Sequence, residues 1–127
     1  MKNIGLLISS LTVFFVILIN LYYNFIALDV KTIEDDIKQC NNIFETILND
    51  KFIDENKNKY TQELFQIKEN INNDKTSFFI KDYKDYKIDI IDSMINYIEN
   101  EDKRDKYLDE INHLEKTAQQ ELNKIIR

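Results

Sequence analysis

The chain has 127 residues, of which 17 are Lys or Arg and 23 are Asp or Glu, so its formal net charge is −6 at pH 7. A nucleic-acid-binding protein needs a basic face to displace counterions from phosphates, so this acidic balance argues against that class and against docking on an anionic lipid surface. The chain contains no Pro, one Gly at Gly5 and one Cys at Cys40, which argues against a strand-rich fold with many tight turns and against an internal disulfide framework.

Charge is distributed very unevenly along the chain. The segment from Ile4 to Leu28 contains 25 residues and not one charged side chain. A helix of that length rises about 37 Å, which exceeds the roughly 30 Å hydrocarbon core of a bilayer. Tyr22 and Tyr23, near its end, are suited to the headgroup level of a membrane. Residues 1–28 are therefore predicted to form a single transmembrane helix that acts as a signal-anchor.

The charges that flank this segment predict its orientation. Lys2 and the amino terminus precede it, whereas Asp29, Glu34 and Asp35 follow it, with Lys31 among them. Because cytoplasmic flanks carry the excess of Lys and Arg, we expect a cytoplasmic N-terminus and an extracytoplasmic C-terminal domain.

A cleaved signal peptide is the alternative to an uncleaved anchor. Such peptides have an apolar region of about 7–15 residues that ends in a small-x-small cleavage site. The charge-free run is longer here, and the one candidate site, after Ala27, has Phe25 where a small residue is preferred. We therefore expect the segment to be retained. Cleavage would instead give a secreted helical protein.

Residues 29–127 carry the pattern of an acidic helical-bundle domain. Four segments place apolar residues three or four positions apart, as one face of a helix requires, over about residues 29–49, 55–72, 77–99 and 102–126. In the first segment the steps alternate between three and four, the spacing of a coiled-coil seam, at Val30, Ile33, Ile37, Cys40, Phe44 and Ile47. Counting back by the same rule reaches Ile26, so we expect the anchor to continue into this helix without a break.

Polar residues mark the connections between these segments. Asn49 and Asp50 end the first helix, and Asp54 is the expected N-cap of the second. Residues 72–77 form the clearest loop, and residues 100–102 separate the third helix from the fourth. The sequence therefore predicts an all-α fold in which the transmembrane helix leads into an antiparallel, four-helix bundle. A long hairpin completed by another subunit is the alternative.

One helix face carries candidate metal ligands. Four aspartates follow one another in steps of three, four and three at Asp82, Asp85, Asp89 and Asp92. Carboxylate oxygens are the ligands that a hard cation such as Ca²⁺ prefers, so this face is either a cation site or an ordinary solvated surface. Glu110 and His113 match the Glu-x-x-His spacing of di-iron bundles, but a chain with a single His cannot supply the second motif. No cofactor is expected.

Three residues are candidates for contacts with other proteins. Cys40 lies on the apolar seam, where it is either a small buried side chain or, in an oxidising compartment, one half of a disulfide between two paired first helices. Phe78 and Phe79 follow a loop directly and are predicted to form an exposed aromatic patch for a protein partner.

The sequence shows no nucleophile–base pair and no Gly-rich phosphate loop, so no catalysis is expected. It predicts a membrane-anchored interaction or structural subunit of an envelope complex, which acts with a protein partner or as a homo-oligomer. Two alternatives stay open. The layout is similar to the N-terminal half of bacterial chemoreceptors, which implies a sensory or ligand-binding bundle. Its topology and size also look like the inner-membrane member of a spanin pair, which implies a phage or mobile-element envelope protein.

Overall fold

The structure is a computed structural model that describes residues 2–126, with side chains from residue 9 to residue 125. Within this range the chain is helical and contains no strand, which confirms the prediction of an all-α fold. The elements are α1 (Lys2–Asn49), α2 (Ile53–Asn73), the 3₁₀ turn η1 (Phe78–Ile80), α3 (Lys81–Glu99), the 3₁₀ turn η2 (Glu101–Lys103) and α4 (Arg104–Ile126).

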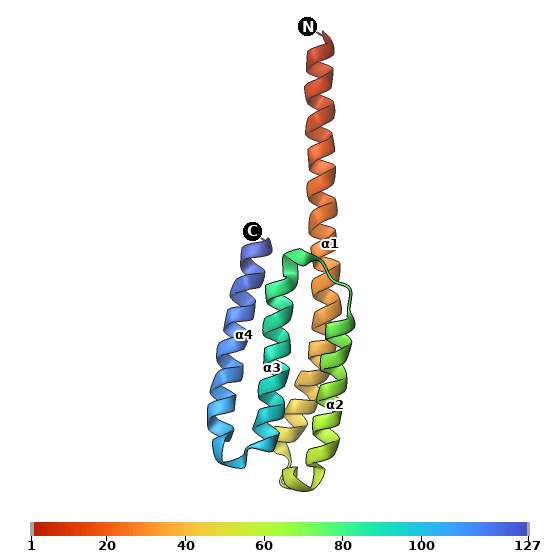
Figure 1. The fold of residues 1–127 in the computed structure, drawn as a ribbon. Coiled ribbons are helices and arrows are strands. Elements are labelled where there is room, and N and C mark those ends of the chain that lie inside the picture. Colours follow the sequence, from red (N-terminus) through yellow and green to blue (C-terminus); the bar gives the residue numbers. More distant parts are fainter. Residues whose placement is uncertain (1, 127) are drawn as a thin grey trace.

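Helix α1 is a single unbroken helix of 48 residues. At about 1.5 Å per residue it is about 72 Å long. Figure 1 shows its N-terminal half projecting alone beyond the other helices, whereas its C-terminal half lies beside α2. The apolar segment and the first helix of the acidic part of the chain are thus one element. No Pro, and no Gly after Gly5, is present to interrupt it.

The C-terminal half of α1 and the other three helices lie side by side, and we call residues 26–126 the helical body. Within it α3 packs against α1, α2 and α4. Figure 1 shows the α1–α2 and α3–α4 connections at the end far from the N-terminus, and the α2–α3 connection at the end from which α1 projects.

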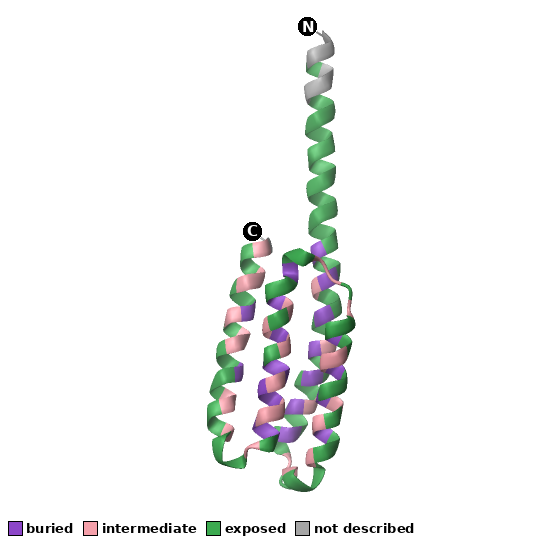
Figure 2. Ribbon diagram, in the orientation of Figure 1, coloured by how far each residue is buried: buried purple, intermediate pink, exposed green. Residues whose placement is uncertain are grey.

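The interior of the helical body is built mainly from isoleucines. The buried residues, purple on the ribbon in Figure 2, recur at intervals along each of the four helices within the helical body. On α1 they include Ile33, Ile37, Cys40, Phe44 and Ile47; on α2, Tyr60, Leu64, Ile67 and Ile71; on α3, Tyr83, Ile90, Met94 and Tyr97. These are the apolar positions that the three-and-four spacing selects. On α4, among the side chains described up to residue 125, only Ile111 and Ala118 are buried, a smaller share than on any other helix.

The start of α2 differs from the prediction, because Asp54 is not its N-cap. The helix begins at Ile53, with Phe52 in the cap position and no side-chain cap. Asp50 holds the turn instead, since its carboxylate accepts hydrogen bonds from the Phe52 amide at 2.8 Å and from the Tyr60 hydroxyl at 2.7 Å. Asp54 therefore lies in the first turn, where its negative charge interacts favourably with the positive end of the helix dipole.

The segment before α3 also differs from a simple continuation of the helix. The third helix was expected from about residue 77, but α3 begins at Lys81, and Phe78–Ile80 form the separate turn η1. Ser77 precedes this turn, and its hydroxyl accepts a hydrogen bond from the Phe79 amide at 3.3 Å. Ile80 is completely buried, so the turn is fixed to the core at its end.

Candidate functional site

The N-terminal half of α1 is apolar and exposed. Every side chain from residue 9 to residue 25 is exposed, as the green part of α1 in Figure 2 shows. The most apolar 18-residue window of this helix has a mean hydropathy of 2.1, and only 6% of it is buried. The core helix of a soluble protein would be mostly buried. The chain therefore contains one helix that is long and apolar enough to span a membrane.

The exposed segment ends abruptly where α1 enters the helical body. From residue 9 onward Ile26 is the first buried residue, and Asp29 is the first charged one after the apolar run. The Asp29 Oδ2 atom accepts a hydrogen bond of 2.7 Å from the Ser77 amide in the α2–α3 connection. This bond links two segments 48 residues apart and fixes the connection beside α1 at the level where its apolar surface ends.

Phe78 and Phe79 belong to the α2–α3 connection, at the end of the helical body from which α1 projects. Phe78 is 81% exposed and Phe79 is 57% exposed. The Phe79 ring makes an edge-to-face contact with Tyr22 of α1, with the ring centroids 5.1 Å apart. Their exposure agrees with the expected aromatic patch, whereas a protein partner for that patch stays a prediction.

Two carboxyl groups meet where α1 lies beside the end of α2. The pKa of Asp36 is raised to about 6. Burial is the largest cause, followed by a hydrogen bond with the Asp74 carboxyl and by the charge of Asp74. Among the described residues, no donor forms a hydrogen bond with the buried Asp74 Oδ2 atom. When Asp36 is protonated it can donate to Asp74, and when both groups are ionised they repel each other. Sequence reasoning missed this pair, because its two members are 38 positions apart.

A second charged group joins three helices. Lys87 of α3 is only 7% exposed, and its ammonium group lies 3.0 Å from Glu115 Oε2 of α4 and 3.7 Å from Glu34 Oε1 of α1. The same Nζ atom lies 5.5 Å from the centroid of the Tyr83 ring, a cation–π arrangement. The sequence contained a signal for this site, since Lys87 occupies an apolar-face position between Tyr83 and Ile90.

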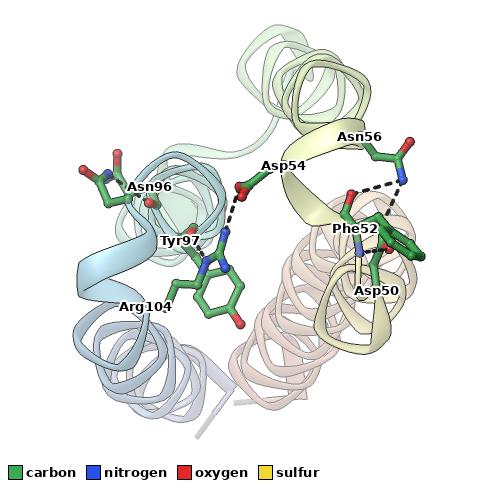
Figure 3. Close-up of polar contacts among 8 residues, drawn as sticks. Asp50, Phe52, Asp54, Asn56, Asn96, Tyr97 and Arg104 are labelled. Carbon is green, nitrogen blue, oxygen red and sulfur yellow. Dashed lines mark hydrogen bonds and ion pairs between the residues drawn. The ribbon is translucent and has the colours of Figure 1, made fainter.

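Polar contacts also hold the opposite end of the helical body, shown in Figure 3. Arg104, at the start of α4, donates from Nε to the Tyr97 carbonyl at 3.2 Å and lies 3.6 Å from Asp54 Oδ1 of α2. Hydrogen bonds from Tyr60, Phe52 and Asn56 lower the pKa of Asp50. The Arg104–Asp54 pair connects the start of α4 with the start of α2, and the Asp50 contacts hold the α1–α2 connection against α2.

The four candidate metal ligands lie along α3 as expected, but two of them have lysine partners. Lys81 Nζ lies 3.1 Å from Asp85 Oδ2, and Lys68 Nζ lies 2.7 Å from Asp92 Oδ1. Asp82 is exposed, and burial, followed by the charges of its acidic neighbours, raises the pKa of Asp89. Over the described part of the chain, no group of three or more His, Cys, Asp or Glu residues is placed to hold a metal ion. This geometry gives the cation-site interpretation no support.

Cys40 lies in the core of the helical body. Its side chain is completely buried, and burial, with a smaller effect from Asp36, raises the pKa of the thiol to about 12. A thiol in this state reacts slowly, because the thiolate is the nucleophile. As the helices pack here, a disulfide between two copies would require α1 to separate from the core.

Replacing Asp36 by Asn should remove a pH dependence from the stability. The folded chain holds the Asp36 proton with a pKa of about 6 against an ordinary value of 3.8, so the free energy of unfolding falls as the pH rises from about 4 to about 6. After screening by solvent we expect a loss of about 1 kcal/mol, or about 4–8 °C in Tm for a domain of this size. Thermal unfolding of the full-length chain in detergent micelles, monitored by circular dichroism from pH 4 to pH 8, measures it.

The Asp36→Asn variant should be more stable than the parent chain at pH 7.5 and should lose this decline. The matched control is Asp35→Asn, because Asp35 is adjacent and exposed. It should keep most of the pH dependence. Identical pH profiles for the parent and Asp36→Asn would show that the two carboxyls do not interact.

Removing the anions around Lys87 should destabilise the chain more than removing Lys87 itself. Glu34→Gln combined with Glu115→Gln leaves a buried ammonium without a countercharge, for which we expect a loss of about 2–3 kcal/mol. Lys87→Met removes the buried charge and leaves two half-exposed carboxylates in water, so its cost should stay within about 1 kcal/mol. Urea unfolding of the full-length variants in micelles compares the two. Equal losses would contradict this account.

Comparisons with known proteins assign no family. No family model matches the chain, and no curated protein or solved structure matches it. The function is therefore argued from the geometry described above.

Proposed function

We propose that this chain is a single-pass membrane protein that carries an antiparallel four-helix bundle on the outer side of a membrane. The bundle acts there as an interaction or structural subunit of an envelope complex. The observation that supports the proposal is the change of surface along α1, whose residues 9–25 are exposed and mostly apolar, whereas Ile26 begins a buried face. Soluble monomers rarely expose an apolar surface of this extent, while lipid covers it on all sides.

The length of the apolar segment matches a bilayer. From Ile4 to Tyr22 the helix rises about 27 Å, close to the roughly 30 Å of the hydrocarbon core. Lys2 lies just before this stretch, and the tyrosine pair Tyr22 and Tyr23 ends it. Because the span lies in one unbroken helix, the backbone groups beyond its first turn pair within the helix, as lipid requires.

The proposed orientation rests on charge. Lys2 and the amino terminus lie on one side of the span, while residues 29–127 carry 16 basic and 23 acidic residues, a net charge of −7. Before the span only Lys2 and the amino terminus are charged, whereas Lys31 and Lys38 after it lie among Asp29, Glu34, Asp35 and Asp36. We base the proposed orientation, with the N-terminus in the cytoplasm and the helical body outside it, on this difference between the flanks.

Three features support the bundle and its role as a subunit. The connections alternate between the two ends of the helical body, and α3 packs against each of the other helices. The charged groups that the fold brings together, at Lys87 and at Asp36, join helices, so we propose no catalytic role. Large apolar side chains remain exposed on the body at Leu48, Phe52 and Phe65, which suits contact with a protein partner or a second copy.

A topology experiment tests the anchor and its orientation. The full-length chain is fused at its C-terminus to alkaline phosphatase or, in parallel, to green fluorescent protein. We expect an active phosphatase and a dark fluorescent protein, because only the first folds outside the cytoplasm. The fusion should stay in the membrane pellet after alkaline carbonate extraction. A fluorescent fusion would show the opposite orientation. A soluble, uncleaved chain would contradict the membrane anchor.

Lysine substitutions provide the matched control. Phe15→Lys together with Val16→Lys places two charges in the span, each of which costs about 2.5–3.5 kcal/mol at the centre of a membrane helix, so the pellet fraction should fall. Phe65→Lys puts a charge on an exposed position of the helical body and should leave that fraction unchanged.

Site-specific photo-cross-linking tests the role as a subunit. A benzophenone side chain at Phe65 or Phe52, which are exposed, should give a light-dependent adduct with a partner or a second copy in intact membranes. The same group at Tyr60, which is buried and similar in size, is the control and should react only within the chain. A chain that stays monomeric at both exposed positions would contradict this role.

A further inference from the structure

The turn η1 exposes two aromatic rings at one particular end of the helical body. Figure 1 shows the α2–α3 connection, which contains this turn, at the end from which α1 projects. Phe78 is the most exposed of the large apolar side chains described, at 81%. An aromatic ring left in water forgoes the favourable burial of its apolar area, so the site calls for an apolar occupant.

The turn is held rigidly, so the two rings project from a fixed position. On one side the Ser77 amide donates to Asp29 of α1 at 2.7 Å, and on the other Ile80 is completely buried in the core. The Phe79 ring rests on Tyr22 with centroids 5.1 Å apart. The backbone and the core therefore determine where Phe78 and Phe79 lie relative to α1.

That position coincides with the boundary of the proposed span. Tyr22 lies about 27 Å along the helix from Ile4, so a ring in contact with it lies at the edge of a hydrocarbon core of about 30 Å. Aromatic side chains are enriched at this depth of the membrane. The contact between Phe79 and Tyr22 thus places the turn at the level of the headgroups.

The space between the turn and α1 is apolar. A groove of about 240 Å³ lies there, and its lining is almost entirely hydrocarbon and aromatic, formed by Leu18, Leu21, Tyr22, Phe25, Ile26, Ser77 and Phe79. Lys75 precedes the turn and is exposed, and a long cationic side chain of this kind reaches lipid phosphates while its stem stays in apolar surroundings. Acyl chains and zwitterionic headgroups match this combination.

We propose that Phe78 and Phe79 insert into the interfacial layer of the same bilayer that α1 spans, so that η1 is a second membrane contact of the chain. The occupant of this surface is phospholipid. The inference rests on the proposed span of α1 and goes beyond it, because a span alone would allow the helical body to stand clear of the lipid. Two contacts on one rigid body fix how that body is inclined to the membrane.

Depth-dependent fluorescence quenching tests the inference. The chain contains no Trp, so Phe78→Trp or Phe79→Trp in the full-length chain gives a single reporter. The proteins are reconstituted in phosphatidylcholine vesicles with or without bromine on the acyl chains. We expect a blue-shifted emission from both reporters and a loss of emission in brominated lipid that approaches the loss in Phe15→Trp, which lies within the span.

Phe52→Trp is the matched control, because Phe52 is 62% exposed at the opposite end of the helical body. Its emission should be the same in both kinds of vesicle, because it lies far from the acyl chains. If Phe15→Trp is quenched while Phe78→Trp behaves like Phe52→Trp, the inference is overturned and the span stands. A blue-shifted but unquenched Phe78→Trp would assign the patch to a protein and also overturn it. An unquenched Phe15→Trp would overturn the span and the inference together.

Discussion

The fold depends on one constraint, the continuity of α1. From residue 9 to Phe25 the same helix is mostly apolar and exposed on all sides, and it then buries a single face from Ile26 to Ile47. Because the backbone does not change course between the two parts, every other element of the helical body is placed relative to the apolar segment. The hydrogen bond between Asp29 and Ser77 transmits that placement to the α2–α3 connection.

Charged groups stabilise the helical body at defined places. Lys87 lies where α1, α3 and α4 meet, and Arg104 connects the starts of α2 and α4 at the other end. The Asp36–Asp74 pair works in the opposite sense above pH 6, because it brings two negative charges together beside a tightly packed helix. Helix α4 buries few side chains completely, so its attachment relies on α3 and on these polar contacts.

The helices and their buried faces could be predicted from the sequence, because spacing of three and four residues is a local property. Ile33, Leu64 and Ile90 are buried where the pattern places them. The site residues were harder, because they depend on which helices become neighbours. The Asp36–Asp74 pair and the contact between Tyr22 and Phe79 join distant segments, and no local pattern marks them. Residue type alone predicts Asp54 as the cap, whereas Asp50, four positions earlier, accepts the hydrogen bonds that hold the turn.

Because α1 is unbroken, the number of residues between its apolar segment and its buried face determines how the helical body is oriented relative to that segment. An α-helix turns about 100° and advances about 1.5 Å with every residue. Inserting or deleting one residue between Tyr22 and Ile33 would rotate the helical body about the axis of α1 and separate the Phe79 ring from Tyr22. Substitutions along that stretch keep this geometry as long as the packing tolerates them, whereas an insertion or a deletion changes it.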